Sequence, residues 1–210
     1  MTMTTDSSAL ETLDERRVER DPIKQFQLWF DDAIAAKIPL AEAMTLATAT
    51  PEGRPSARMV LLKHVDEEGF VFFTNYHSAK AVQLDSNPYA ALVFYWNPLD
   101  RQVRVEGKVE RTPVEESELY FQTRPRESQI GAWASPQSSV IAGREVLERR
   151  ARELEDYYRD REIECPGHWG GYRLRPDKIE FWKSRTGRLH DRILYELMSD
   201  STWSIKRLAP

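Results

Sequence analysis

Residues 90–110, AALVFYWNPLDRQVRVEGKVE, contain the two clearest strand patterns of the chain. Residues 90–96 form a nearly continuous apolar run, which predicts a strand that is covered on both faces. From residue 101 to residue 110 apolar and polar side chains alternate, so Val103, Val105 and Val109 should point to one face of a strand. Because the connection between the two segments is short, they are predicted to be neighbours in an antiparallel sheet.

The rest of the chain continues this pattern of short strands, with helices inserted between them. Further strands are predicted at residues 44–50, 57–65, 70–74, 170–176, 178–183, 192–197 and 203–209. Helices are predicted at residues 22–36, 78–87, 112–124 and 144–159, the last on the surface because its apolar stripe is thin. This order does not fit a parallel βαβ fold. It predicts a mainly β, α+β architecture, in which helices pack outside an antiparallel, barrel-like sheet.

Local signals and composition also predict the boundaries. Asp21 and Pro22 supply a cap and a first-turn proline for the first helix, and Pro125 should interrupt the third. Residues 1–20 are polar and charged without a sustained period, which predicts a mobile arm. Residues 21–210 contain no obvious linker and are predicted to form a single domain.

The bulk composition is that of a globular chain. Of 210 residues, 40% are hydrophobic and 30% charged, and the net charge of −4 gives no general attraction to nucleic acid. No apolar run approaches the length of a membrane span, and the N-terminus lacks the apolar stretch of a secretory signal. Cys165 is the single cysteine, so a disulfide framework is excluded. These features predict a cytoplasmic protein.

Common catalytic motifs are absent from the sequence. It has no GxGxxG, P-loop, HExxH or GxSxG motif. His64, His77, His168 and His190 lack the spacing of metal ligands, and we expect no metal site.

Several polar residues at strand ends and helix starts could bind an anion. Thr74 closes a predicted strand, and Ser78 and Lys80 open a helix whose free N–H groups could receive a phosphate. The same Ser and Lys could equally start an ordinary solvated helix. Arg58 and Lys63 are five residues apart on one predicted strand, so they face opposite sides unless a bulge intervenes. The neighbouring Val60, Leu61 and Leu62 predict that this strand is buried, where a lysine would be costly.

Two further groups of residues leave the choice between structure and function open. Tyr120, Arg124 and Ser128 are spaced by four and would share one helix face if Pro125 did not interrupt the helix. The segment RTGRLHDR, residues 185–192, could be a charged hairpin, or an anion-binding or acid–base site at a strand edge.

A series of longer motifs, in order along the chain, resembles the pyridoxine/pyridoxamine 5′-phosphate oxidase family. The motifs are RMVLLK (58–63), FFTN (72–75), SAKA (78–81), RQVRVEGKVER (101–111), YFQTRPRESQIGAWASPQSS (120–139), HWGGYRL (168–174), IEFW (179–182), RLHDR (188–192) and the terminal RLAP. The resemblance extends from Asp21 to Pro210.

The resemblance implies an FMN-binding split β-barrel and a homodimer with the cofactor between the subunits. FMN would be bound by Arg58, Lys63, Phe73, Thr74, Ser78, Lys80, Gln102, Gln137, Ser138, Trp182 and Arg192. The substrate would be bound by Lys63, Tyr120, Arg124, Ser128, Arg188 and His190, of which Arg188 and His190 would be catalytic.

The implied reaction is oxidation of pyridoxine or pyridoxamine 5′-phosphate to pyridoxal 5′-phosphate. Oxygen would accept the electrons and give hydrogen peroxide, and the amine substrate would release ammonia. Two positions depart from the family pattern: Ala79 stands where an arginine is common, and Phe73 where a tyrosine is common. The alternatives are a related flavin oxidase of phenazine biosynthesis, a non-catalytic carrier of FMN or pyridoxal phosphate, and a nucleic-acid-binding protein.

Overall fold

The computed structural model describes residues 12–210. A nine-stranded sheet has the order β2-β1-β5-β6-β7-β4-β3, and β8 and β9 extend it from β7. The strands are β1 (Ala43–Ala49), β2 (Pro55–Leu61), β3 (His64–Asp66), β4 (Gly69–Asn75), β5 (Tyr89–Trp96), β6 (Arg101–Arg111), β7 (Trp169–Lys183), β8 (Asp191–Leu197) and β9 (Trp203–Arg207). All the strand pairs among these residues are antiparallel, as the sequence predicts.

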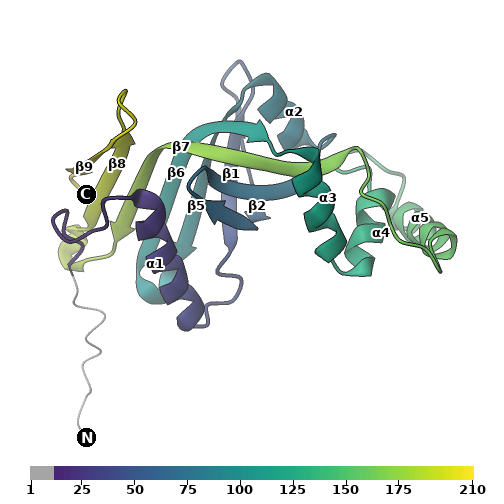
Figure 1. Ribbon diagram of the computed structural model, residues 1–210, viewed down its shortest axis with the longest axis horizontal. Helices are drawn as coiled ribbons and strands as arrows, with labels where there is room; N and C mark the ends of the chain where they lie inside the picture. The colour runs from purple at the N-terminus through teal and green to yellow at the C-terminus, as the bar shows by residue number, and fades with distance from the viewer. Residues whose placement is uncertain (1–11) are drawn as a thin grey trace, which may run out of the picture.

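The helices are gathered around this sheet. They are α1 (Pro22–Ala35), α2 (Ala79–Ser86), α3 (Val114–Thr123), α4 (Arg126–Ala134) and α5 (Arg144–Tyr157). Figure 1 shows α3, α4 and α5 at one end of the sheet, while α1, β8 and β9 lie at the other. Among residues 12–210 no helix is long and apolar enough to cross a membrane.

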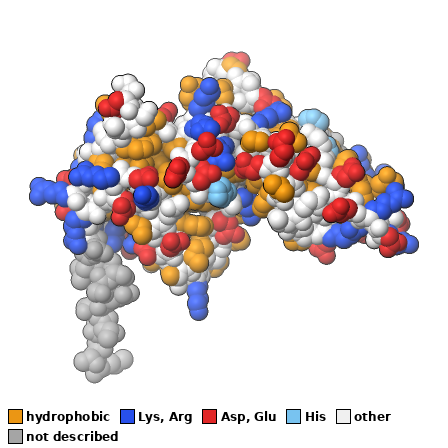
Figure 2. Space-filling view, in the orientation of Figure 1, with side chains coloured by type: hydrophobic (Ala, Val, Ile, Leu, Met, Phe, Trp, Pro, Cys, Tyr) orange, Lys and Arg blue, Asp and Glu red, His pale blue; other side chains and the backbone are white. Residues whose placement is uncertain are grey.

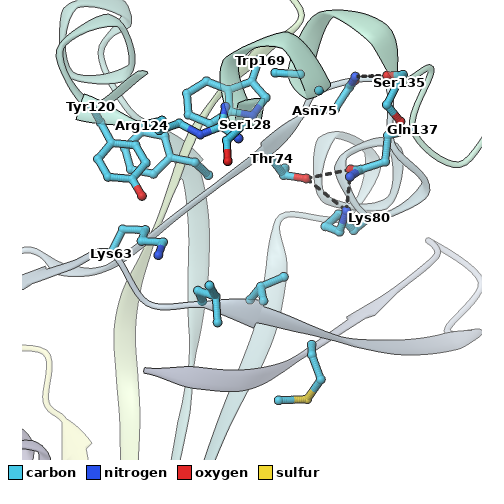
Figure 3. A pocket seen from close by; sticks show the side chains of 16 residues that line it. Lys63, Thr74, Asn75, Lys80, Tyr120, Arg124, Ser128, Ser135, Gln137 and Trp169 are labelled. Atoms are coloured by element: carbon cyan, nitrogen blue, oxygen red, sulfur yellow. Dashed lines mark hydrogen bonds between the residues drawn. The ribbon is translucent and has the colours of Figure 1, made fainter. Parts of the chain in front are cut away.

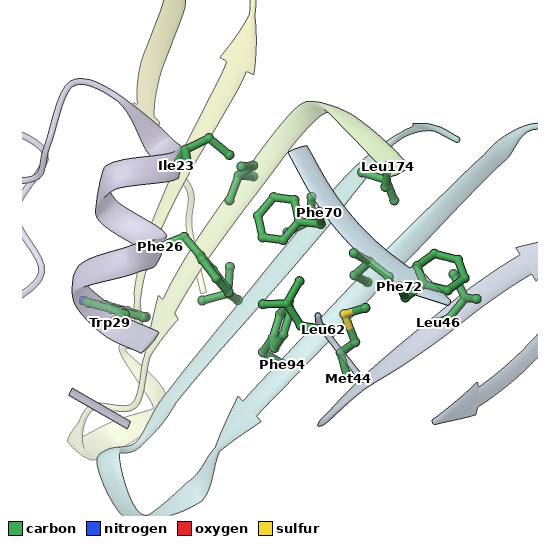
Figure 4. Close-up of a cluster of buried hydrophobic side chains, with 14 of the residues drawn as sticks. Ile23, Phe26, Trp29, Met44, Leu46, Leu62, Phe70, Phe72, Phe94 and Leu174 are labelled. Atoms are coloured by element: carbon green, nitrogen blue, oxygen red, sulfur yellow. The ribbon is translucent and has the colours of Figure 1, made fainter. Parts of the chain in front are cut away.

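The main core lies between α1 and the sheet. Helix α1 begins as predicted, because the Asp21 side chain accepts a hydrogen bond from the Ile23 N–H at 2.8 Å. Phe26, at the centre of α1, packs against Phe70 and Phe94 with ring centroids 4.9 Å apart in both cases (Figure 4). A second cluster, around Phe121 and Trp169, joins α3 and α4 to the start of β7.

Two strands are less covered than the sequence predicts. In β5 the side chains of Leu92 and Phe94 are fully buried, but Tyr95 on the opposite face is 59% exposed. Strand β2 was expected to be buried, yet it lies at the edge of the sheet, and Met59 is 62% exposed. An apolar strand does not reveal which chain covers it, and here no other part of residues 12–210 covers these faces.

Two other predicted boundaries differ from the structure. The strand expected at residues 57–65 is divided into β2 and β3, while the two strands expected at 170–176 and 178–183 form one strand, β7. Pro176, at the predicted break, is accommodated because the pairing of β7 with β6 shifts its register opposite Glu106 and Gly107.

The predicted N-terminal arm lies only partly within the described residues. Residues 1–11 are outside them, whereas Leu13, Glu15 and Glu19 contact β8 and β9. Arg207 donates a hydrogen bond to the Leu13 carbonyl at 2.7 Å and pairs with Glu15 at 2.7 Å.

On the face drawn in Figure 2, Lys and Arg side chains are interspersed with Asp and Glu.

Candidate active site

A cavity of about 440 Å³ lies where α3 and α4 face β4 and the end of β2 (Figure 3). It is lined by Met59, Val60, Leu61, Lys63, Phe73, Thr74, Asn75, Lys80, Tyr120, Arg124, Ser128, Gly131, Ala132, Ser135, Gln137 and Trp169. These include eight of the residues that the family resemblance assigns to FMN or substrate. The lining within the described chain has three cations, Lys63, Lys80 and Arg124, and no carboxylate. Such a cavity should attract an anion.

Lys80 forms one corner of the cavity, at the start of α2. Ser78 caps this helix as predicted, and its hydroxyl accepts a hydrogen bond from the Ala81 N–H. The Lys80 ammonium donates to the side-chain oxygens of Thr74 at 3.0 Å and Gln137 at 2.9 Å. Burial, and to a smaller extent the nearby charge of Arg58, lower the pKa of Lys80. All three partners of the ammonium, Ser78 included, are neutral oxygens.

Ser138 lies beside the same helix start. Its hydroxyl accepts a hydrogen bond from the Ala79 N–H at 3.1 Å. Its backbone has a φ of 71°, in the left-handed region that non-glycine residues rarely adopt. Rare backbone conformations of this kind are often found at binding sites. At the Ala79 position the site therefore offers backbone and hydroxyl groups rather than a guanidinium.

Arg124 forms the opposite corner of the cavity. Pro125 ends α3 as predicted, so Tyr120 lies on α3 and Ser128 on α4, yet all three side chains reach the cavity. The Arg124 guanidinium lies 4.6 Å from the centre of the Trp169 ring. Its Nη1 is buried and has no hydrogen-bond partner among the described residues. Burial lowers the pKa of Arg124. A buried donor without an acceptor is costly, so the arrangement around Arg124 fits a binding site for an anion.

Stacked aromatic rings form the wall next to Arg124. The ring of Phe73 lies 4.1 Å from that of Tyr120 and 5.3 Å from that of Trp169, nearly parallel to both. Phe73 therefore contributes its ring to the cavity wall, and a phenolic hydroxyl is not needed for this stacking. Trp169 belongs to the HWGGYRL motif, and neither that motif nor the family resemblance gave it a role at the site.

Arg58 and Lys63 lie on different sides of the cavity wall. Lys63 follows the end of β2 and lines the cavity, and its N–H donates to the Val71 carbonyl at 2.9 Å. Arg58 does not line the cavity. Its guanidinium donates to the side chains of Thr48 at 2.6 Å and Gln83 at 3.2 Å. Arg58 and Lys63 are separated because Arg58 lies on β2, whereas Lys63 lies in the connection between β2 and β3. Neither the alternation of one strand nor a bulge is responsible.

Five further predicted site residues form a second group on β6, β7, β8 and the connection between β7 and β8. Gln102 is opposite Trp182 on β6 and β7, and Trp182 is opposite Arg192 on β8. The His190 ring lies 4.7 Å from the Trp182 ring, and its Nδ1 accepts a hydrogen bond from the Arg185 N–H at 3.1 Å. Arg188 is exposed and has a φ of 62°, which is again in the left-handed region.

The two groups are far apart within one chain. Trp169 begins β7 and Trp182 is near its end, so most of its 15 residues lie between them. At about 3.3 Å per residue, the path along the strand is roughly 40 Å. Figure 1 likewise places α3 and α4 at the opposite end of the sheet from β8.

Neither a metal centre nor a reactive thiol emerges from the described residues. No three His, Cys, Asp or Glu side chains of residues 12–210 are grouped as a metal site. Burial raises the pKa of the Cys165 thiol to about 11, so it stays protonated at neutral pH.

Family models match most of the chain. Residues 30–158 match the family described as pyridoxamine 5′-phosphate oxidase. Residues 169–210 match the pyridoxine 5′-phosphate oxidase C-terminal dimerisation region.

Named relatives and solved structures agree with these models. A protein from Trichormus variabilis named pyridoxine/pyridoxamine 5′-phosphate oxidase is 55% identical, over 96% of this chain and 94% of that protein. A protein of the same name from Burkholderia lata is also 55% identical, over 95% of this chain and 94% of that protein. The structure of PhzG from Burkholderia lata, in complex with tetrahydrophenazine-1-carboxylic acid, has a TM-score of 0.90 and 28% identity, covering 96% of this chain and 100% of that one. An FMN-binding protein from Nostoc punctiforme, related to pyridoxamine 5′-phosphate oxidase, shares the fold with a TM-score of 0.71 and 20% identity over 88% of this chain and 97% of that one.

The sheet and its cationic cavity thus define a split-barrel protein of the oxidase type, and the predicted fold class is confirmed. More specifically, the chain belongs to the pyridoxine/pyridoxamine 5′-phosphate oxidase family.

Proposed function

We propose that the protein is an FMN-dependent oxidase that converts pyridoxine or pyridoxamine 5′-phosphate to pyridoxal 5′-phosphate. Oxygen is the electron acceptor and hydrogen peroxide is a product. With the amine substrate, water hydrolyses the imine that oxidation gives, and ammonia is released. The observation that supports this most is the cavity, which residues 12–210 line with three cations and no carboxylate, and in which the buried Arg124 Nη1 has no hydrogen-bond partner among those residues. Both the cofactor and the substrates carry a phosphate.

The corner around Lys80 fits the phosphate of FMN. Ser78, Lys80 and Ser138 surround the first turn of α2, where a helix presents free N–H groups to an anion. Thr74 and Gln137 hold the Lys80 ammonium, so it needs little rearrangement to meet a phosphate. Arg58 adds positive charge from behind the cavity wall. Bound here, FMN would supply the redox chemistry, taking two electrons from the substrate and giving them to oxygen.

The corner around Arg124 fits the substrate phosphate. Lys63 and Arg124 supply charge, and Tyr120 and Ser128 supply hydroxyl donors. The stacked rings of Phe73 and Tyr120 restrict the orientation of the phenol. Anchoring the phosphate in this way would fix the distance between the reacting carbon and the cofactor.

The second group of residues completes the site from a second copy of the chain. Gln102, Trp182 and Arg192 would contact FMN, and Arg188 and His190 would contact the substrate. Because His190 Nδ1 accepts the Arg185 N–H, Nε2 is the ring atom that can donate a hydrogen bond to the substrate. The match of residues 169–210 to a dimerisation region and the long separation along β7 both support a homodimer with two shared sites.

A second candidate is oxidation of a tricyclic carboxylate, favoured by the similarity to PhzG bound to tetrahydrophenazine-1-carboxylic acid. A carboxylate could also meet Arg124. Identity of 55% to a Burkholderia lata protein named pyridoxine/pyridoxamine 5′-phosphate oxidase, against 28% to PhzG from that organism, favours the phosphorylated substrate.

The test is anaerobic addition of pyridoxine 5′-phosphate to the FMN-loaded protein, with flavin absorbance as the readout. We expect the flavin to bleach and its colour to return when oxygen is admitted. Unphosphorylated pyridoxine, the matched control, should bleach the flavin far more slowly. A bound flavin that neither substrate bleaches would contradict the proposal, and bleaching by a phenazine precursor alone would support the second candidate.

A further inference from the structure

We propose that Glu180, together with the backbone carbonyl of Ala209, is a positioning group that fixes the Arg192 guanidinium and thereby sets the affinity for FMN. The inference rests on the proposed function, because Arg192 is taken to be an FMN contact. It assigns a role to Glu180 of the IEFW motif and to the terminal RLAP segment, which the site described above leaves without one.

The Arg192 side chain is held on two sides. Its Nε donates to Glu180 Oε1 at 2.8 Å and its Nη2 to Glu180 Oε2 at 3.1 Å, a paired contact that fixes the plane of the guanidinium. Its Nη1 donates to the Ala209 carbonyl at 2.9 Å. Of the five N–H groups of an arginine, these contacts use three. One N–H on each Nη therefore stays available to a ligand in a fixed direction.

Glu180 is well placed for this role because it is nearly buried. Only 6% of the residue is exposed, and Arg104 donates to Oε2 at 3.1 Å from the other side. The carboxylate thus lies between cations on β6 and β8. Because Arg104 is also paired with Glu106, the negative charge of Glu180 can balance the positive charge of Arg192. The hydrogen bonds from Arg192 to Glu180 raise the pKa of Arg192, so the arginine stays charged.

The RLAP segment closes around the same point of β8. The Leu208 N–H donates to the Arg192 carbonyl at 2.9 Å, so the backbone and the side chain of Arg192 are both tied to the segment. One residue earlier, the Arg207 guanidinium donates to Asp191 at 2.8 Å. Residues 207–209 therefore restrain the start of β8, immediately after His190.

The decisive experiment is a double-mutant cycle on FMN affinity. Apoprotein would be titrated with FMN and binding followed by quenching of flavin fluorescence, for the wild type, Glu180→Gln, Arg192→Lys and the double variant. When Arg192 is unchanged, we expect Glu180→Gln to weaken FMN binding by about 10-fold, the effect of losing one charge-assisted contact. In the Arg192→Lys background, where the paired geometry is already lost, the same change should alter binding by less than about twofold.

Controls separate positioning from general loss of structure. Glu196→Gln is the matched control, because Glu196 also joins cations from neighbouring strands, Lys206 at 2.6 Å and Lys178 at 3.7 Å, but does not touch Arg192. It should leave FMN affinity unchanged. Thermal unfolding of each apoprotein would be measured in parallel. A chain ending at Leu208, which lacks the Ala209 carbonyl but keeps Glu180, should also bind FMN more weakly.

Each outcome has a distinct meaning. Wild-type affinity in Glu180→Gln, or equal losses in the two backgrounds, would overturn the positioning role. A shortened chain that binds FMN like the full chain would remove Ala209 from it. If the wild-type protein itself failed to bind FMN, the proposed function would fail instead.

Discussion

Three side-chain cations line a cavity whose described lining holds no carboxylate. The buried Nη1 of one of them, Arg124, has no hydrogen-bond partner in the part of the chain that the structure describes. Such an arrangement lowers the stability of the free protein, because desolvated charge is not compensated until a ligand arrives. At the scale of single residues, the same uncompensated charges therefore lower the stability of the protein without ligand and raise its affinity for an anion. This trade can be tested at Arg124 and at Lys80.

Replacement of Arg124 by methionine keeps the length of the side chain and removes its charge. We expect the KM for pyridoxine 5′-phosphate to rise by about 10- to 100-fold, since hydrogen bonds to charged groups contribute roughly 1.5–3 kcal/mol. The melting temperature of the apoprotein should not fall. Steady-state kinetics and thermal unfolding give both quantities, with the exposed Arg144→Met as control. An equal rise in KM for unphosphorylated pyridoxine would contradict the assigned phosphate contact.

The affinity for FMN should depend on pH through Lys80. Burial lowers the pKa of Lys80 from its ordinary value of 10.5, and an anion binds its charged form. Affinity should therefore be highest below the lowered pKa and fall as pH rises through it. The empty protein should show the opposite trend, gaining stability between the lowered pKa and 10.5, because the unfolded chain then binds more protons.

The measurement is a series of FMN titrations from about pH 7 to about pH 9.5, below the ordinary lysine range. Lys80→Arg is the control, since arginine stays charged throughout and should flatten the profile. A profile that stays equally steep in Lys80→Arg would assign the titration to another group.

At the scale of elements, strand β7 depends on two glycines where it pairs with β4. Gly170 is opposite Thr74, and Gly171 is opposite Phe73. A Cβ on Gly171 would collide with Thr112 and lie 2.9 Å from the Phe73 ring. The close approach of these strands therefore brings Phe73 and Thr74 into the cavity wall.

We expect Gly171→Ala to lower the stability of the protein by about 1–3 kcal/mol, the usual cost of overpacking. It should also weaken substrate binding, because the Phe73 ring must move. Thermal unfolding and KM measure the two effects. Gly167→Ala is the control, because a Cβ there would meet no atom of residues 12–210 within 4 Å. Unchanged stability in Gly171→Ala would mean that the strands separate at little cost.

Element by element, local chemistry made some features predictable and long-range contacts hid others. Caps at Asp21 and Ser78 and the alternation in residues 101–110 predicted α1, α2 and β6 correctly. Pro176 resembled a strand end, but β7 continues past it through a shift of register against β6, with Asp177 as the extra residue on β7. The exposed faces of β2 and β5 could not be foreseen, because apolar sequence does not specify which chain covers it.

The candidate site divides in the same way. The Ser78–Lys80 pattern lies on one helix start and was visible in the sequence. The convergence of Tyr120, Arg124 and Ser128 across Pro125 was implied only by the family resemblance. Their spacing could not show it, since it depends on the angle between two helices. Glu180 is hidden within an apolar strand pattern, and its pairing with Arg192 depends on the register of β7 and β8.

At the scale of the whole molecule, the cavity and the second group of residues lie at opposite ends of the sheet. Two copies of the chain would bring the second group of each to the cavity of the other. The proposed site is therefore a property of the dimer, and a single chain would carry two halves of different sites.

Complementation tests this arrangement directly. Lys80→Ala and Arg188→Ala should each be inactive alone, because they damage the two halves of the site. When the variants are coexpressed, half of the dimers should be mixed, and each mixed dimer has one site free of both changes. We expect recovery of about a quarter of wild-type activity. Coexpression of Lys80→Ala with Lys63→Ala, which damage the same half, should restore none. No recovery in the first pair would assign both groups to one chain.

Strand β7 has a further consequence in the proposed dimer. Its first residue, Trp169, lines the cavity of its own chain, and Trp182, near its end, would serve the partner's cavity. The length of the strand would then fix the distance between the two reaction centres. An insertion or deletion in it would disturb both centres at once. Selection on either centre would therefore constrain the length of β7 more tightly than its composition.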